Sequence, residues 1–101
     1  MIKFHPQNIV SVEDEAYLVN PTTYLLLKQF ISAPRMLLSK EDIRQDVLFD
    51  EDARNGTIRQ AIFNARQDIL RCYLPIDIYT IIGKGYQLQF LTDDEIPPAD
   101  Y

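Results

Sequence analysis

Apolar residues between Asn55 and Cys72 recur at the spacing of an α-helix. At about 100° per residue, five of them fall on one stripe, which should face a core. The opposite face carries amide side chains and one phenylalanine. This pattern predicts an amphipathic helix that is buried on one side and open to a partner on the other. The stripe comprises Ile58, Ala61, Ile62, Ala65 and Ile69, and the open face comprises Gln60, Phe63, Asn64 and Gln67.

The segment Asp77–Leu91 has the alternation of two β-strands. Ile78–Ile82 is β-branched and aromatic, and apolar residues alternate with glutamines further along the chain. Gly83-Lys84-Gly85 lies between these two runs, and glycine accepts the positive φ angles that tight turns require. We therefore predict a β-hairpin with Lys84 at its tip.

The N-terminal residues predict two short strands, Asn8–Val12 and Ala16–Val19, which are apolar and are separated by an acidic turn. Asn20-Pro21 then favours a helix start, with Asn as the N-cap and Pro in the first turn. This helix should extend to about Ser32, because the Ala-Pro pair at Pro34 ends it. Since the segment is apolar nearly all round, we expect burial on more than one side.

A second, shorter helix is predicted for Lys40–Leu48. Ser39 is a suitable N-cap, and the acidic residues that follow it interact favourably with the helix dipole. Phe49–Gly56 is an acidic stretch, and we predict a loop there because Asn55-Gly56 is a strong turn signal. The third helix and the hairpin follow this loop.

The predicted order is strands, helix, helix, acidic loop, helix and hairpin, which indicates an α+β fold. A chain of 101 residues is long enough for one domain with a core of its own. We assign that domain to residues 1–91. Residues 92–101 contain two prolines and four acidic residues, and we expect a loose tail or a linker.

The formal net charge of −5 argues against a nucleic-acid partner, because duplex binding uses Lys and Arg to neutralise phosphates. Between Arg54 and Thr92, however, five basic residues stand against two acidic ones, which gives a local charge of +3. Arg59 and Arg66, seven residues apart, share one flank of the open helix face. Amides that contact bases beside guanidiniums that contact phosphates favour DNA recognition. The alternative is that these arginines only keep a helix face soluble.

Other function classes find little support. With one His, one Cys and no glycine-rich phosphate loop, nothing indicates an enzyme or a cofactor. The consecutive acidic residues Asp50, Glu51 and Asp52 lack the spacing of a calcium loop, so we expect no metal. We expect His5 to be structural and Cys72 to be a small buried hydrophobe.

Cysteine and hydropathy bear on location. A single cysteine excludes a disulfide within the chain and fits a reducing compartment. No run approaches eighteen apolar residues, so we expect neither a membrane span nor a secretion signal in these residues. We predict a cytoplasmic location, at the cytoplasmic face of the inner membrane if the natural chain continues into an anchor.

Several strings, taken in order and with their spacing, are typical of one family. They are Val19–Leu27, Leu37–Ile43, Thr57–Ile62 with Arg66, and Thr80-Ile81 with Gly85–Leu88. Together they resemble the winged helix-turn-helix DNA-binding domains of the OmpR/PhoB type, and more closely those of ToxR/CadC-like transcriptional activators. The resemblance covers about residues 4–91.

The resemblance implies an N-terminal antiparallel β-sheet, three helices and a C-terminal hairpin called the wing. It implies double-stranded promoter DNA as the partner, with the third helix in the major groove and the wing on the minor groove or backbone. It also implies that the loop between the second and third helices touches RNA polymerase. Homodimers or a co-regulator are further partners to test.

Individual roles follow from the same resemblance. Thr57 and Arg66 would contact phosphates, Gln60 and Asn64 would read bases, and Lys84 would serve the wing. The full predicted DNA contact set is Thr57, Arg59, Gln60, Phe63, Asn64, Arg66, Gln67, Thr80 and Lys84. The predicted polymerase or partner contacts are Asp50, Glu51, Asp52 and Arg54.

The chain departs from the family pattern in two places. Family recognition helices usually carry several Arg or Lys after their midpoint, where this chain has Asn64, Gln67 and Asp68, and a wing position that is often basic is Ile82. Fewer phosphate contacts predict weaker and less salt-dependent binding by a lone domain. Dimerisation or clustering at a membrane would raise affinity through effective concentration. The alternative hypothesis is a winged-helix protein-interaction module, an antagonist or co-regulator that has lost strong DNA binding.

Phe63 and its neighbours leave further alternatives open. Phe63 lies about 140° from the buried stripe, and it either contacts a thymine methyl or a partner protein, or packs beneath the hairpin. Gln60 and Asn64 each have the groups to bond adenine, or they are ordinary solvated amides.

Overall fold

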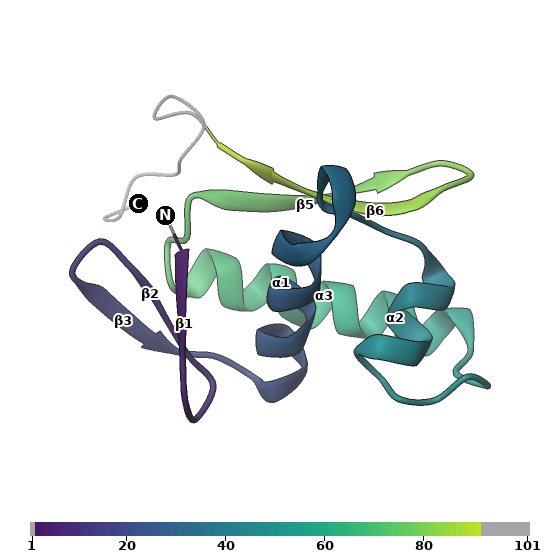
Figure 1. The fold of residues 1–101 in the computed structure, drawn as a ribbon, viewed down its shortest axis with the longest axis horizontal. Coiled ribbons are helices and arrows are strands. Elements are labelled where there is room, and N and C mark those ends of the chain that lie inside the picture. Colours follow the sequence, from purple (N-terminus) through teal and green to yellow (C-terminus); the bar gives the residue numbers. More distant parts are fainter. Residues whose placement is uncertain (1, 92–101) are drawn as a thin grey trace.

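The computed structural model describes residues 2–91, in which three α-helices and a short 3-10 helix pack with two three-stranded sheets (Figure 1). The longest helix, α3 (Asn55–Arg71), runs along the molecule and packs against α1 (Pro21–Ser32). One sheet lies near the C-terminal end of α3, and α2 (Lys40–Asp46) lies near its N-terminal end. The predicted tail, residues 92–101, lies outside the described residues.

The N-terminal sheet has three antiparallel strands in the order β1-β2-β3. Two of them confirm the predicted strands with slightly shifted ends, and β1 is an additional strand. It pairs with β2 in the register Ile2↔Val12, and Ile2 is buried in the core. A strand this short shows too little alternation to be recognised in the sequence. The strands are β1 (Ile2–His5), β2 (Ile9–Val12) and β3 (Glu15–Leu18).

Helix α1 begins and ends as its sequence predicts. The Asn20 side-chain oxygen accepts a hydrogen bond from the Thr22 N–H at 2.9 Å, and Pro21 occupies the first helical position. The helix stops at Ser32, before Pro34. Its apolar residues are buried on more than one side, since the fully buried Leu26, Leu27 and Phe30 are accompanied by the half-buried Tyr24 and Leu25.

Helix α2 is stabilised by a reciprocal cap. The Ser39 hydroxyl accepts from the Asp42 N–H at 3.0 Å, while the Asp42 carboxylate accepts from the Ser39 N–H at 2.9 Å. The helix ends at Asp46, so the predicted end at Leu48 is too late. The chain turns away because Phe49 adopts a positive φ of 54°, which no helix can continue.

Helix α3 confirms the predicted amphipathic pattern, but its start corrects the expected turn at Asn55-Gly56. Those two residues form the first helical turn, and Arg54 is the N-cap. The Arg54 carbonyl accepts from the N–H groups of Thr57 and Ile58 at 3.0 and 3.2 Å. Tertiary packing of the buried stripe outweighs the local turn preference of an Asn-Gly pair. Every residue of the predicted stripe is buried: Ile58, Ala61, Ile62, Ala65 and Ile69.

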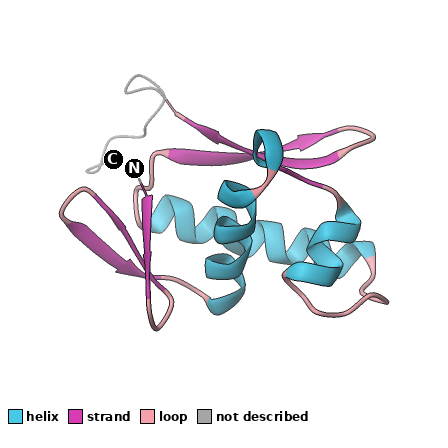
Figure 2. Cartoon of the chain, in the orientation of Figure 1, coloured by secondary structure: helices cyan, strands magenta, loops and turns pink. Residues whose placement is uncertain are grey.

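The second sheet has the order β4-β6-β5 and contains the predicted hairpin (Figure 2). Its strand β4 is only two residues long, follows the 3-10 helix Pro34–Met36, and was not predicted. Gly85 makes this pairing possible, because a Cβ at this position would stand 2.1 Å from the Leu38 carbonyl oxygen. Glycine is therefore required where β6 passes β4. The strands are β4 (Leu37–Leu38), β5 (Ile76–Ile81) and β6 (Gly85–Phe90).

One hydrophobic core joins these layers. Side chains from α1, α2, α3 and both sheets meet in a single cluster, so the hairpin and the N-terminal sheet are both anchored to α3. The consequence for function is that the outer face of α3 and the hairpin beside it are held by the same core.

Candidate nucleic-acid interface

The outer face of α3 is exposed where its sequence pattern predicted. Gln60, Asn64 and Gln67 lie on the solvent side of the helix, opposite the buried stripe. Phe63 lies among them with 54% of its surface exposed. This aromatic ring therefore does not pack beneath the hairpin, and α3 presents an apolar group within a polar face.

Two amides on this face are joined to each other. The Gln60 Nε2 group donates a hydrogen bond to Asn64 Oδ1 at 3.0 Å, across one turn of the helix. Residues four apart on a helix are neighbours, so this bond fits the ordinary helical spacing. The two side chains form one unit, whereas their sequence positions alone suggested two independent amides.

Arg59 and Arg66 have different surroundings despite sharing one flank of the helix. The Arg66 guanidinium donates twice to the Ile78 carbonyl of β5, from Nε at 3.1 Å and from Nη2 at 2.7 Å, and is partly buried. Arg66 thereby holds the hairpin against α3. Arg59 is exposed and makes no side-chain hydrogen bond or ion pair with the described residues, so its charge is open to a ligand.

The hairpin β5–β6, hereafter the wing, closes through a tight turn. The Lys84 N–H donates to the Ile81 carbonyl at 3.0 Å, and Gly83 between them has a φ of 81°. The turn therefore covers Ile82 to Lys84, one position earlier than predicted, because Gly85 pairs with Ile81 at the start of β6.

The tip of the wing is open to solvent. Lys84 and Thr80 are exposed, and Ile82 is 94% exposed. The tip therefore combines one cation with an unpacked aliphatic side chain.

The C-terminal end of α3 is bonded to the elements beside it. The Asp68 carboxylate accepts from the Asn20 backbone N–H and from Arg71 Nη2, each at 3.0 Å, and Arg71 also donates to the Leu18 carbonyl at 3.1 Å. Burial raises the pKa of Asp68, but the hydrogen bonds from Asn20 and Arg71 outweigh it and the pKa is lowered. The sequence offered no signal for this role, because the partners lie 48 and 53 residues away.

The loop between α2 and α3 is more ordered than its acidic composition suggests. Arg44 spans it, donating to the Ala53 carbonyl at 2.7 Å and to the Asn55 side chain at 2.8 Å, and it also pairs with Glu41. Sequence reasoning missed both Arg44 and the neighbouring Phe49, which is 73% exposed. The predicted partner-contact residues Asp50, Glu51, Asp52 and Arg54 are all exposed on this loop.

Thr57, the remaining predicted phosphate contact, is exposed in the first turn of α3. It borders a shallow hollow of about 180 Å³ together with Gln60 and Asn64, where α3 meets Thr22 of α1. The structure therefore gathers Thr57, the amide pair and Phe63 on one helix, while it places Thr80 and Lys84 on the wing.

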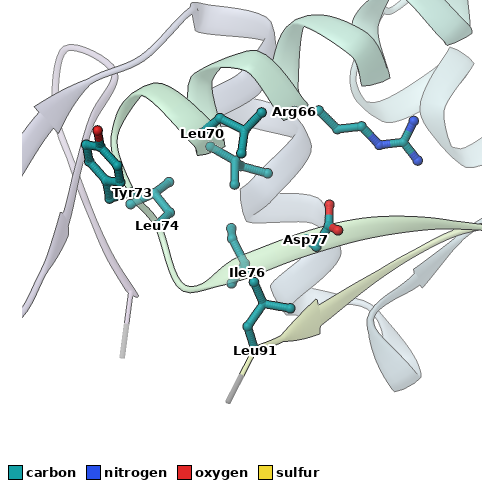
Figure 3. Close-up of a pocket in the computed structure, with 8 residues that line it drawn as sticks. Arg66, Leu70, Tyr73, Leu74, Ile76, Asp77 and Leu91 are labelled. Atoms are coloured by element: carbon teal, nitrogen blue, oxygen red, sulfur yellow. The ribbon is translucent and has the colours of Figure 1, made fainter. Parts of the chain in front are cut away.

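A hollow of about 220 Å³ lies between the C-terminal half of α3 and β5 (Figure 3). Arg66 and Asp77 lie on one side of it, and the rest of its lining is largely apolar. The lining residues are Arg66, Ile69, Leu70, Tyr73, Leu74, Ile76, Asp77 and Leu91.

Residues that suggested other chemistry serve the fold. His5 Nε2 and Ser11 Oγ are hydrogen-bonded at 2.7 Å between neighbouring strands, and Cys72 is buried with 1% exposure, as expected for both. Burial raises the pKa of the Cys72 thiol. Across residues 2–91, no group of three His, Cys, Asp or Glu side chains is arranged to hold a metal ion. No helix in this range has the length and apolarity needed to cross a membrane.

Solved structures supply the decisive comparison. Similar folds are found in the C-terminal domain of the nisin resistance regulator NsrR (22% identity, 90% of this chain and 94% of that chain, TM-score 0.68) and in the DNA-binding domain of Escherichia coli CadC (22% identity, 83% and 80%, TM-score 0.68). A third is the DNA-binding domain of the response regulator AdeR, solved in complex with an intercistronic region (16% identity, 88% and 94%, TM-score 0.73). The chain has the winged-helix fold.

The likeness covers 83–90% of this chain and confirms, at the level of the fold, the resemblance to OmpR/PhoB-type and CadC-like domains. Structures with identities of 22% and below establish the fold. The residues of the candidate interface are inferred from this chain's own sequence and structure. No family model and no curated protein matches the sequence.

Proposed function

We propose that this winged-helix domain binds double-stranded promoter DNA as the DNA-binding part of a bacterial transcription regulator. In this proposal α3 enters the major groove, and the wing lies on the minor groove or backbone. The observation that carries the proposal is the outer face of α3, which is exposed, polar and tethered to the wing by Arg66. Two of the three similar structures support it, since both are DNA-binding domains and that of AdeR was solved with an intercistronic region.

The basic side chains that remain unpaired predict how strongly DNA affinity depends on salt. Arg71 pairs with Asp68, and Arg66 bonds to a backbone carbonyl. Of the predicted DNA contacts, Arg59 and Lys84 have no such partner among the described residues and remain for phosphates. Two phosphate contacts give a slope of about −1.8 in log K against log salt, so affinity should fall about 12-fold between 50 and 200 mM salt.

The loop between α2 and α3 is the proposed contact for RNA polymerase or another partner. Its acidic side chains at Asp50, Glu51 and Asp52 are exposed, and Arg44 fixes the loop from within. An ordered loop loses less conformational entropy on binding than a flexible one. Asp50→Asn combined with Asp52→Asn should therefore leave DNA binding intact and weaken only the partner contact.

The proposal is tested by equilibrium anisotropy with duplexes selected from a random library, at 50 and at 200 mM salt. Sequence-selective binding that weakens with salt supports it. Gln60→Ala should reduce the preference for selected over random DNA, whereas Arg59→Ala and Lys84→Ala should weaken both about equally. Absence of binding at 50 mM salt and high protein concentration would refute it.

The second candidate is a winged-helix protein-interaction module. It is favoured by the net charge of −5 and by the exposed apolar side chains Phe49, Phe63 and Ile82. Aromatic and aliphatic groups on an acidic surface suit a partner protein better than a phosphate backbone. The same titration separates the two, because a module of this kind binds no duplex even at low salt.

A further inference from the structure

The amide pair on α3 has a defined hydrogen-bonding complement. The bond from Gln60 to Asn64 uses one hydrogen of Gln60 Nε2, which leaves the Gln60 Oε1 acceptor, the second Nε2 hydrogen and the Asn64 Nδ2 donors for a ligand. Exchanging the oxygen and nitrogen of both amides would interchange the roles of the two residues and leave the same kinds of group. The unit therefore offers an acceptor and donors, a turn apart on the exposed face.

This complement distinguishes base pairs in the major groove. Adenine presents a donor at N6 beside an acceptor at N7, and its partner thymine adds an acceptor at O4. Guanine presents two acceptors, N7 and O6, and its partner cytosine adds a donor at N4. On adenine the donor and the acceptor of the amide pair both find partners on one base, whereas on a G·C pair the acceptor would have to reach the cytosine. The amide pair therefore favours A·T, and the methyl group of thymine separates the two pairs further.

Phe63 supplies the second, independent observation. Its ring is 54% exposed on the same face, between the two amides in sequence. The only apolar group on the major-groove edge of any base is the methyl group of thymine. Phe63 therefore lies on the helix face where a thymine methyl would be found if the amide pair contacted adenine.

The arginines of α3 also favour an A·T pair over a G·C pair. Arginine is the commonest reader of guanine, through a bidentate contact with O6 and N7. In this helix Arg66 is bonded to the Ile78 carbonyl, and Arg71 is bonded to Asp68 and the Leu18 carbonyl. Within α3, Arg59 alone keeps a guanidinium without a described partner, and it lies on the flank of the face.

We infer that α3 reads an adenine–thymine base pair, with Gln60 and Asn64 acting as one hydrogen-bonding unit on adenine and Phe63 contacting the thymine methyl. This inference rests on the proposed DNA-binding function and specifies the class of sequence that the domain selects. It replaces two independent amide contacts by a single paired one.

The first experiment selects binding sites for the full chain from a random duplex library at 50 mM salt. The sites should share an A·T base pair, and replacing that pair by G·C should weaken binding about tenfold. A G·C pair at this position of the selected sites, or equal affinity for both base pairs, overturns the inference while leaving DNA binding established. Absence of binding to any duplex overturns both the inference and the proposed function.

The second experiment removes only the thymine methyl, by substituting deoxyuridine at each thymine of the selected site. One position should lose about threefold to fourfold in affinity with the unmodified protein, the value of one buried methyl group. Phe63→Ala should bind the two duplexes equally, and Phe63→Leu should retain part of the difference. An equal loss in Phe63→Ala would show that another residue reads the methyl.

The third experiment tests whether the amides act as one unit. Gln60→Ala, Asn64→Ala and the double variant should show losses that do not add, with the double variant no weaker than the weaker single one. Gln45→Ala is the control, because Gln45 is an exposed helical amide on α2 that lies outside the predicted contact set and has no side-chain bond to a described residue. It should leave the A·T preference unchanged. Additive losses at Gln60 and Asn64 would refute the paired reading.

Discussion

The two halves of α3 use the same residue types for different purposes. In the N-terminal part, residues 55–64, Arg59 and the amides Gln60 and Asn64 stay on the surface and bond at most to each other. In the C-terminal half, Arg66 and Arg71 bond to carbonyls of β5 and β3. The difference arises from neighbours, because β5 supplies a carbonyl next to Arg66 and β3 supplies one next to Arg71, whereas no described group bonds to the Arg59 side chain.

This contrast assigns the two flanking arginines to separate tasks. Arg59 and Arg66 are seven residues apart on one flank of the helix. Only Arg66 lies next to β5, and its two hydrogen bonds set the position of the wing relative to α3. The phosphate contact that the family resemblance implies for Arg66 stays a prediction, and it would have to compete with those bonds.

The largest effect is expected for Arg66→Ala. Losing two charge-assisted hydrogen bonds to the Ile78 carbonyl should lower the free energy of unfolding by about 2 kcal/mol. Urea denaturation measures this change. DNA affinity should also fall, because the wing that carries Lys84 is misplaced. In a Lys84→Ala background, a further drop of about one in the salt slope on removing Arg66 would instead assign Arg66 to a phosphate.

Asp68→Asn comes next, with a loss of about 1 kcal/mol at neutral pH. Because folding lowers the pKa of Asp68, its carboxylate stabilises the fold above about pH 4, and this contribution disappears as the pH falls through the lowered pKa. Thermal unfolding from pH 7 to pH 2 should show the difference between the two proteins shrink as acid is added. Asp52→Asn, on the exposed loop, is the control and should change stability little. A difference independent of pH would contradict the assignment.

Arg59→Ala should leave the unfolding free energy within about 0.5 kcal/mol, since its side chain is exposed and bonds to none of the described residues. Its expected effect is on DNA, where selected and random duplexes should weaken by the same factor and the salt slope should drop by about one. Anisotropy titrations at four salt concentrations give both quantities. A stability loss as large as that of Arg66→Ala would remove the contrast between the two halves.

The smallest structural effect belongs to Asn64→Ala. An exposed amide pair one turn apart stabilises a helix by about 0.2–0.5 kcal/mol, and alanine recovers part of that through its helix propensity. Urea midpoints should therefore nearly coincide with those of the unsubstituted protein. A loss above about 1 kcal/mol would place the Gln60–Asn64 pair among the structural contacts of the C-terminal half.

Much of the fold was readable in advance because it depends on local patterns. The stripe of α3, the caps at Asn20 and Ser39 and the glycines of the wing act within a few residues of themselves. The errors were also local. Asn55-Gly56 forms a helical turn instead of the expected loop, and the turn of the wing starts at Ile82. The two unpredicted strands, β1 and β4, exist only through partners elsewhere in the chain.

The sequence by itself determined which face of α3 is buried, where α1 and α2 are capped and that the segment with the candidate interface is the basic part of the chain. Periodicity, capping and charge are properties of neighbouring residues, so no tertiary information was needed. Tertiary structure decided which charged side chains remain available, because the partners of Arg66, Asp68 and Arg71 lie up to 53 residues away. A hydrogen bond forms between atoms that the fold brings together, and spacing along the chain does not contain that distance.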